Sequence, residues 1–423
     1  YRPAMPRPRV LALIQAGGVG GRLDVLTRER AKPALPFAGV HQLVDFPLSN
    51  LAHSGISDVW LSLQYQGSTL QEQVANGRPW DLDRNLGGLR ILLPHEGTGG
   101  MDEEGFARGN ADELFRFRDE LASFEPDVVL VMSADHVYRL DYHDVLETHR
   151  DRDAECTVVV VESPEGDDPG DHGVVHVDEG RITAFDYKPD DPDGSTIVAE
   201  VIAYDPTVLR EVLEELHREL NADAEISAAE GDTGLGDFGD HLLPRLVERG
   251  RTYAHRYDGY WRDVGQPHHY LRAHREVLTD DRDVLSVPSW PILSRLPQRV
   301  PARVLDGAEV GDSLLSPGCR VAGVVRRSVL GPGVVVEAGA EVHDSVLLSD
   351  TVVRAGARVH WSVVDADCEV AANARLGDPD ASQALDDPDL VTLVGRGSRV
   401  VGAHPSGSRF EPGSMAAAGA SSR

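Results

Sequence analysis

Short apolar runs alternate with longer segments of mixed polarity in the first half of the chain. The runs with the length and composition of buried strands are Val10–Ile14, Asp58–Leu63, Val128–Met132 and Thr157–Val161. Between them, Leu114–Phe124 and His143–Arg152 predict helices. This alternation is typical of a doubly wound, Rossmann-like α/β sheet, which binds ligands at the carboxyl ends of its strands.

The pattern changes toward the end of the chain, where short valine-rich stretches recur every 17 residues. The triplets that begin at Ser328, Ser345 and Ser362 keep this interval, and Gly339 and Gly356 mark turns one interval apart. Such a repeat cannot bury an apolar face alone and must stack on its neighbours. We therefore expect a left-handed parallel β-helix with about 18 residues per coil. The alternative is an irregular all-β domain.

A proline-rich segment, Val284–Arg303, separates the two patterns. Proline holds itself and the preceding residue in extended conformations, so this segment predicts a linker. The expected domains are a catalytic α/β domain over residues 1–283 and a β-helix over residues 304–402. Residues 403–423 are rich in Gly, Ser, Ala and Pro, and we expect a disordered tail there.

Composition limits the class of protein. A chain of 423 residues is too long for one ordinary core. No stretch approaches the roughly 20 apolar residues of a membrane helix. The first nine residues lack the apolar core of a signal peptide, and the missing initiator Met leaves the native start open. Cys156, Cys319 and Cys368 lie far apart and predict buried thiols. We expect a cytoplasmic protein with no membrane partner.

The formal net charge of −29 argues against nucleic-acid binding. Most of the acidic side chains are expected to serve only solubility. A polyanionic ligand would need local Arg, Lys, backbone N–H groups and metal cations to overcome this field.

The first predicted strand ends in a glycine cluster, Gly17-Gly-Val-Gly-Gly-Arg-Leu23, and Arg30-Ala-Lys-Pro33 follows closely. Glycines let backbone N–H groups close around phosphate oxygens. Arg22 and Lys32 supply the positive charge that a triphosphate needs. The spacing is neither G-x-G-x-x-G nor that of a P-loop.

Further motifs follow along the chain. They are Val44-Asp-Phe-Pro-Leu-Ser-Asn50, Gln64-Tyr-Gln66, Arg108-Gly-Asn-Ala-Asp112, Ala134-Asp-His-Val-Tyr138, Lys188-Pro189, Asp237-Phe-Gly239 and Tyr260-Trp-Arg-Asp-Val-Gly265. These motifs and their order along the chain resemble those of the bacterial ADP-glucose pyrophosphorylases, or glucose-1-phosphate adenylyltransferases. The resemblance covers about residues 9–400. That family joins a nucleotidyltransferase domain to a left-handed β-helix, as the two hydrophobic patterns also predict.

The resemblance implies a reaction in which a sugar 1-phosphate attacks the α-phosphate of a nucleoside triphosphate and pyrophosphate leaves. It implies that Asp135 and Asp263 bind Mg²⁺. The alternative for either residue alone is a structural role as the cap of a helix or as part of a turn. Arg22 and Lys32 would bind the β- and γ-phosphates. Lys188 would bind the sugar phosphate, unless it is a solvated loop lysine.

The resemblance also implies a nucleotide site and an assembly. The residues assigned to the nucleotide are Gly17, Gly18, Gly20, Arg22, Gln64, Arg108, Gly109 and Asp112. Gln64 would contact the nucleotide base. The alternative is that it is only a polar residue at the end of a strand. The family is tetrameric, so we expect a homotetramer.

The chain departs from the family at the strand end and in the sugar pocket. Gln15 stands where the family has an aliphatic residue before Ala-Gly-Gly. Tyr187 replaces the acid of Glu-Lys-Pro, which contacts sugar hydroxyls. Counting back from Tyr204, Val198 replaces a serine and Glu200 a glycine of the sugar pocket. Glu200 could thus supply the acid that position 187 has lost.

We therefore expect condensation of ATP, or another nucleoside triphosphate, with glucose 1-phosphate. A cyclitol 1-phosphate nucleotidyltransferase and a non-catalytic regulatory paralogue remain open. A further rival is an acyltransferase whose β-helix uses a histidine. His343 and His360 keep the repeat interval and are interpreted as corner residues instead.

Overall fold

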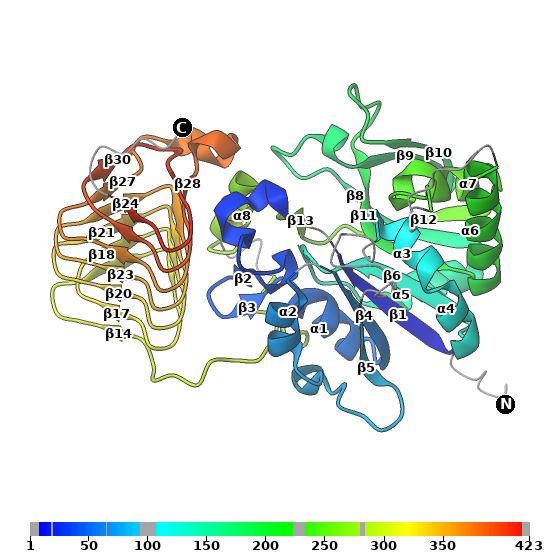
Figure 1. Cartoon of the computed structure of the whole chain (residues 1–423), viewed down its shortest axis with the longest axis horizontal. Helices are drawn as coiled ribbons and strands as arrows, with labels where there is room; N and C mark the ends of the chain where they lie inside the picture. Colours follow the sequence, from blue (N-terminus) through cyan, green and yellow to red (C-terminus); the bar gives the residue numbers. More distant parts are fainter. Residues whose placement is uncertain are drawn as a thin grey trace.

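The computed structural model of the chain describes residues 8–17, 20–64, 66–93, 107–222, 233–279 and 284–416. An α/β domain and a β-helix lie side by side, and the segment from residue 284 onward connects them (Figure 1). Both predicted architectures are therefore confirmed.

In the described part of the chain, the α/β domain is built on a nine-stranded sheet whose strands β1, β4, β5 and β6 run parallel. Its strands, in spatial order, are β5 (Gly88–Leu92), β4 (Asp58–Leu63), β1 (Val10–Ala16), β6 (Val128–Ser133), β11 (Thr196–Tyr204), β8 (Cys156–Glu162), β12 (Thr252–Arg256), β10 (Arg181–Tyr187) and β9 (Gly173–Asp178). The four strands predicted from apolar runs are β1, β4, β6 and β8.

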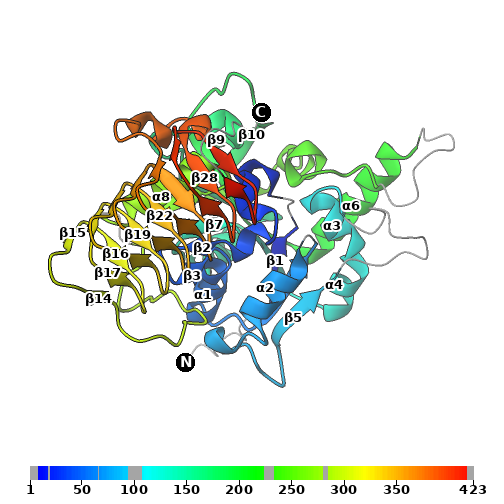
Figure 2. The ribbon, with the colours of Figure 1, turned by 60° about the vertical axis from the view of Figure 1, so that its left-hand side comes forward.

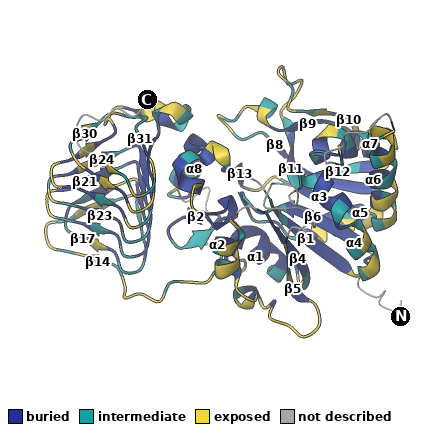
Figure 3. Ribbon diagram, viewed as in Figure 1, coloured by how far each residue is buried: buried dark blue, intermediate teal, exposed yellow. Residues whose placement is uncertain are grey.

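Helices cover both faces of this sheet. They are α1 (Asp45–His53), α2 (Gly67–Val74), α3 (Asn110–Arg116), α4 (Arg118–Phe124), α5 (Tyr142–Asp151), α6 (Pro206–Leu220) and α7 (Leu243–Glu248). Helix α8 (Pro267–Glu276) instead joins the apolar cluster shared with the β-helix. Successive residues of β1 enter different cores: Ala12 and Ile14 join α1, α2 and α5, whereas Leu11 and Leu13 join α3, α4, α6 and α7. A strand apolar on both faces is therefore buried on both faces (Figure 3).

The carboxyl edge of the parallel strands gathers the predicted motifs. Gly17 follows β1, and Asp135 follows β6. A small two-stranded sheet pairs β7 (His136–Tyr138) with β13 (Trp261–Asp263) in antiparallel register, Asp263 opposite His136. This pairing brings together two motifs that lie far apart in the sequence.

The second domain is a left-handed parallel β-helix with three faces. The first sheet consists of β14 (Arg303–Val304), β17 (Arg320–Val321), β20 (Val335–Val336), β23 (Val352–Val353), β26 (Glu369–Val370), β29 (Arg399–Val400) and β32 (Met415–Ala416). The second consists of β15 (Glu309–Gly311), β18 (Val324–Arg326), β21 (Glu341–His343), β24 (Arg358–His360), β27 (Arg375–Leu376) and β30 (Ala403–His404). The third consists of β16 (Leu314–Leu315), β19 (Val329–Leu330), β22 (Val346–Leu347), β25 (Ser362–Val364), β28 (Thr392–Val394) and β31 (Arg409–Phe410).

The 17-residue period has a side-chain basis. The backbone N–H of Ser345 donates to Oγ of Ser328 (3.1 Å), and that of Ser362 donates to Oγ of Ser345 (3.2 Å). Inside the coil, Val342 stacks on Val359, and both are fully buried. An insertion with short 3₁₀ segments, η7 (Ser382–Leu385) and η8 (Pro388–Leu390), interrupts the period before β28.

The β-helix extends past the boundary expected at residue 402. Strands β30, β31 and β32 lie within the segment expected to be disordered, and Phe410 is buried. Small and polar residues suit the tight corners of a β-helix as well as a disordered tail, so composition gave the wrong answer for residues 403–416. Residues 417–423 lie outside the described part.

The third sheet of the β-helix faces the α/β domain (Figures 1 and 2). A single apolar cluster joins Val346 and Leu393 of that sheet to Phe37, Tyr270 and other residues of the catalytic domain. The domains therefore share a core rather than touching only through the linker.

Within the described residues, no helix is long and apolar enough to cross a membrane. The three cysteines, all in the described part, are buried free thiols, as predicted.

Candidate active site

Two carboxylates and one ammonium group meet at the carboxyl edge of the sheet. Nζ of Lys32 lies 2.6 Å from Oδ2 of Asp135 and 3.3 Å from Oδ1 of Asp263. Lys32 opens the short segment η2 (Lys32–Ala34), Asp135 follows β6, and Asp263 ends β13. The structure thus brings together three of the side chains that the sequence assigned to catalysis.

Electrostatics keeps all three groups charged. Burial alone disfavours the charged forms, but the Lys32 ammonium holds the pKa values of Asp135 and Asp263 below their usual range. The two carboxylates in turn raise the pKa of Lys32, against burial. Two negative charges face one positive charge here, so the site retains an affinity for a further cation.

Space for that cation is provided by Gly265 of the Tyr260–Gly265 motif. A side chain at this position would lie 3.0 Å from both Oδ1 of Asp263 and Nζ of Lys32. Hard carboxylate oxygens around an open position suit Mg²⁺. The residues present therefore fit the implied metal.

Asp263 is held in place by its neighbour Arg262, which is almost fully buried. The Arg262 guanidinium lies 2.8 Å from Oδ2 of Asp167 and donates to Glu276. Arg272 binds the same Asp167 (2.9 Å) and also Asp386 of the β-helix insertion (2.6 Å). One network thus connects the metal-site strand to the second domain.

His136 lies at the centre of a ring of acids. Its Nδ1 lies 3.3 Å from the carbonyl oxygen of Ala199, and its Nε2 lies 3.6 Å from Asp135, 3.8 Å from Asp263 and 4.0 Å from Glu200. The ligand atoms of Asp135, His136 and Glu200 all lie within 4.8 Å of one another. Glu200 therefore lies beside the carboxylate pair.

Glu200 occupies a backbone position suited to glycine. The register of β11 shifts between Val198 and Ile202, and Glu200 in this bulge has a φ of 53°. Its side chain is 38% exposed. Burial of the carboxyl, together with Asp135 and Asp263, raises the pKa of Glu200.

The other sugar-side residues lie on the neighbouring strands. The Tyr187 hydroxyl donates to Asp237 (3.1 Å), and the exposed Lys188 ammonium lies 4.7 Å from the centre of the Tyr187 ring. Val198 is buried in the core, so its contact with a sugar remains a prediction.

On the nucleotide side, the glycine loop touches Gln64. A Cβ at Gly17 would lie 2.7 Å from Nε2 of Gln64, so a larger residue there would displace this side chain. Gly20 has a φ of 67° and precedes η1 (Gly21–Thr27), whereas Gly18 lies outside the described residues.

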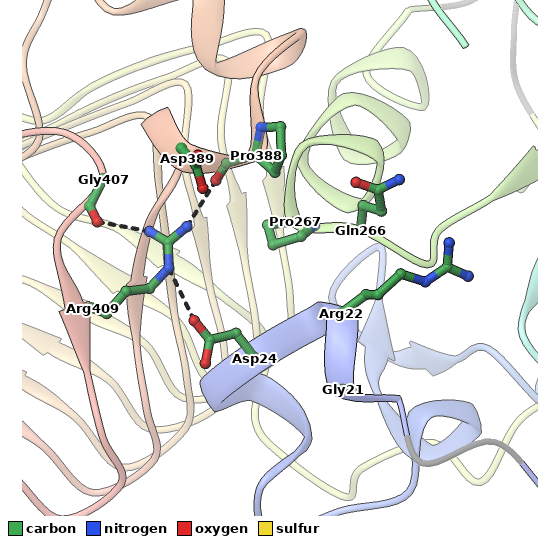
Figure 4. Close-up of a pocket in the computed structure, with 9 residues that line it drawn as sticks. All are labelled: Gly21, Arg22, Asp24, Gln266, Pro267, Pro388, Asp389, Gly407 and Arg409. Carbon is green, nitrogen blue, oxygen red and sulfur yellow. Dashed lines mark hydrogen bonds and ion pairs between the residues drawn. The ribbon is translucent and has the colours of Figure 1, made fainter. Parts of the chain in front are cut away.

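Arg22 is exposed and lines a cleft of about 640 Å³ between the two domains. In Figure 4 its side chain extends away from Arg409, which binds Asp24 (3.1 Å) on the other side of the cleft. The positive charge of Arg22 opposes the rise in the pKa of Lys32 and helps to lower the pKa of Asp263.

The loop that begins α3 is fastened by Asp112. Its carboxylate accepts from the backbone N–H of Arg108 (2.7 Å), from Arg116 (3.0 Å) and from Thr233 (2.7 Å). Gly109 packs directly against the backbone of Gly236, where a Cβ would clash. Asp112 and Gly109 thus shape the loop, and direct contacts of Arg108, Gly109 and Asp112 with a nucleotide remain predictions.

Sequence reasoning missed two features of the site. One is Glu113, a buried acid that accepts hydrogen bonds from Gln15, Ser62 and Gln64. The other is Gly265, where a Cβ would lie 3.0 Å from both Oδ1 of Asp263 and Nζ of Lys32. A charged residue in a helix that packs on the sheet was the available signal for Glu113.

These observations define a class. A doubly wound sheet presents a glycine loop, a lysine and a pair of carboxylates at its carboxyl edge. These groups are typical of an enzyme that transfers phosphate groups.

Comparison with known proteins identifies the same class of enzyme. The family model "Nucleotidyl transferase" matches residues 11–280, and the model "GlmU-like, C-terminal hexapeptide" matches residues 300–387. The chain is 34% identical to a glucose-1-phosphate adenylyltransferase of Clostridium acetobutylicum over 337 residues, 78% of this chain and 84% of the relative. It is 34% identical to that of Bacillus thuringiensis and 33% identical to that of Bacillus mycoides, each over 80% of this chain and 87% of the relative. The chain therefore belongs to the nucleotidyl transferase family, among the glucose-1-phosphate adenylyltransferases.

Proposed function

We propose that this protein condenses ATP with glucose 1-phosphate to give ADP-glucose and pyrophosphate. Asp135 and Asp263 are the main support, because both carboxylates lie against the Lys32 ammonium at the carboxyl edge of the sheet, where α/β sheets bind ligands. The names of the relatives supply the substrates.

Asp135 and Asp263 would hold Mg²⁺. When bound, this ion would neutralise charge that develops on the α-phosphate and on the leaving pyrophosphate. The glycine loop binds the triphosphate through backbone N–H groups, and Lys32 and Arg22 compensate the charge of its β- and γ-phosphates.

Lys188 binds the phosphate of the sugar. The attacking oxygen of a sugar phosphate is already an anion, so His136 has no proton to remove. Catalysis in this site consists of aligning two anions that repel each other and stabilising the charge that moves to the leaving group.

A panel of nucleoside triphosphates against sugar phosphates, read by pyrophosphate release and by mass spectrometry of the product, tests this function. We expect the highest kcat/KM with ATP and glucose 1-phosphate. An Asp263→Asn variant serves as the inactive control. Failure to turn over any pair would contradict the proposal and favour a regulatory paralogue.

One observation favours a second candidate, a cyclitol 1-phosphate nucleotidyltransferase. Glu200 introduces a carboxylate beside His136, and Tyr187 replaces an acid in the sugar pocket. A substrate with a different set of hydroxyls would suit such a pocket. Turnover only with a carbocyclic phosphate would establish this reading.

We also propose a homotetramer in the cytoplasm, in line with the family. The three buried free thiols suit a reducing compartment. Light scattering combined with gel filtration would measure the mass of the assembly.

A further inference from the structure

Four polar side chains, two of them buried and two half-buried, form a cluster at the carboxyl ends of β1 and β4. Gln15 is the penultimate residue of β1, Ser62 is the penultimate residue of β4, Gln64 follows β4, and Glu113 lies in the first turn of α3. Gln15 and Ser62 are partners in the register of the two strands. Glu113, only 2% exposed, lies at the centre of the cluster.

Three hydrogen bonds of this cluster end on the Glu113 carboxylate. Nε2 of Gln15 donates to Oε2 (2.8 Å), Nε2 of Gln64 donates to Oε1 (3.0 Å), and the Ser62 hydroxyl donates to the same Oε1. Burial raises the pKa of Glu113, and these donors oppose the rise. A buried carboxyl group without such donors would be costly.

The directions of these bonds are fixed by chemistry. Gln15 also donates through Nε2 to the carbonyl oxygen of Asn110 (2.9 Å), which can only accept. Glu113 likewise offers acceptors, so it selects the nitrogen of the Gln64 carboxamide. The Gln64 oxygen then takes no part in the bonds to Glu113.

Gln64 lies between this cluster and the glycine loop. Its Nε2, held by Glu113, is also the atom that a Cβ at Gly17 would approach to 2.7 Å. Gly17, which has no Cβ, leaves room for the carboxamide in this position, and the bond to Glu113 opposes its rotation. Its orientation is set before any nucleotide arrives.

We propose that Glu113 is a positioning residue that fixes the Gln64 carboxamide with its oxygen toward the base, so that the site selects a base with an amino group. This inference rests on the nucleotide half of the proposed function. The six-amino group of adenine donates to such an oxygen, whereas hypoxanthine presents a carbonyl there and leaves two acceptors facing each other.

Gln15 helps to hold the Glu113 carboxylate in place. The family has an aliphatic residue at this position, which could give no hydrogen bond to an acid at position 113. The hydrogen bond from Gln15 therefore compensates part of the cost of burying the Glu113 carboxylate.

The test compares ATP with ITP, which differ at the edge that Gln64 would read. Calorimetric titration of the purified full chain gives the Kd of each nucleotide, and turnover with glucose 1-phosphate gives kcat/KM. In Glu113→Gln the new carboxamide can donate to the Gln64 oxygen and turn it inward. We expect its preference for ATP over ITP to fall about tenfold or more, the scale of one mismatched hydrogen bond.

Further variants separate positioning from a general structural role. Gln15→Leu should lower the same ratio less, since it removes one of three donors. Glu155→Gln is the matched control, because Glu155 pairs with Arg249 (2.8 Å) beside the amino end of β8, away from the site. It should keep the wild-type ratio. The thermal midpoint of each variant monitors folding.

An unchanged ATP:ITP ratio in a folded Glu113→Gln protein, or a wild type that binds both nucleotides equally, would overturn the inference. Binding is measured apart from turnover. A chain that binds ATP over ITP but turns over no sugar phosphate would contradict the proposed function and leave this selection intact.

Discussion

Arg30 and Asp365 form a buried ion pair between the two domains, with Nη2 of the arginine 2.7 Å from Oδ1 of the aspartate. Arg30 belongs to the same four-residue motif as Lys32, which reaches the carboxylate pair of the site. Burial raises the pKa of Asp365, and the Arg30 guanidinium offsets part of this rise. One short motif thus connects the β-helix to the catalytic centre.

Asp365→Ala should lower the free energy of unfolding by about 3 kcal/mol, because it leaves Arg30 as a buried charge without its partner. Urea titration measures this. Asp350→Ala is the matched control, since its pair with Arg299 is exposed, and it should cost less than about 1 kcal/mol. Replacing both Arg30 and Asp365 by leucine should cost less than Asp365→Ala alone. Equal losses in the two alanine variants would contradict this account.

Asp263→Asn should fold normally and lose roughly 10²–10⁴-fold in kcat, because it removes one negative ligand while keeping the shape of the side chain. Asp135→Asn should behave alike. The double variant should fall far short of the product of the two effects, since both carboxylates face one cation. Steady-state kinetics over a range of Mg²⁺ concentrations measures this. A single variant with more than half of the wild-type activity would remove the metal assignment.

Lys32→Ala should raise KM for ATP more than KM for the sugar phosphate, and Lys188→Ala should do the reverse. The structure separates the two side chains: Lys32 is buried between two aspartates, and Lys188 is exposed over Tyr187. Each lysine is therefore assigned to one anion. Initial rates with both substrates varied measure the split, and equal effects on both KM values would mean that the sites are misassigned.

The buried His274 predicts a loss of stability in acid. Its Nε2 accepts from the backbone N–H of Ala38 (3.1 Å), and burial lowers its pKa from 6.5 to about 4. Between these pH values the unfolded chain takes up a proton that the folded chain refuses. Stability is thus retained above pH 6.5 and lost as pH falls toward 4, by at most about 3 kcal/mol for this residue.

Urea unfolding at several pH values tests this point. His274→Gln should flatten the pH dependence between 6.5 and 4 relative to wild type. Leu86, which is 90% exposed and carries no titratable group, provides the control, and Leu86→Gln should follow the wild-type curve. Parallel curves for wild type and His274→Gln would show that His274 does not titrate in this way.

The elements that local patterns encode were predictable. Alternate residues of β1 enter two cores, so its apolar run is recognised without knowledge of its neighbours. Ser328 and Ser345 repeat because each serine bonds the next coil. Residues 403–416 were not predictable from composition, since the buried Phe410 lies among the small residues that corners require.

Site residues that belong to short sequence motifs could be predicted from the sequence. Residues that enter the site through contacts with distant parts of the chain could not. Asp135 and Asp263 follow from short motifs. Glu113 meets Gln15 across 98 residues and Gln64 across 49, and nothing local to Glu113 specifies these partners. The left-handed conformation of Glu200 could be foreseen only from the glycine that it replaces.

Glu200→Gly, alone or with Tyr187→Glu, should shift the preference among sugar phosphates toward glucose 1-phosphate. Glu200 lies in a bulge at a φ of 53°, so glycine relieves the backbone as well as removing the carboxylate. Stability should therefore be kept or rise slightly. A substrate hydroxyl that donates to Glu200 would lose about 1–3 kcal/mol when the acid is removed.

Specificity constants for glucose 1-phosphate and for a carbocyclic phosphate, in wild type and in both variants, decide the matter. Glu162→Gln is the control, since this acid lies on the neighbouring strand β8 and binds Ser195 and Thr196. Its ratio should equal that of wild type. If the ratio stays within about twofold in every variant, Glu200 does not face the sugar. Its carboxylate, 4.0 Å from His136, would then serve the cation site instead, and the reason to expect an unusual substrate would disappear.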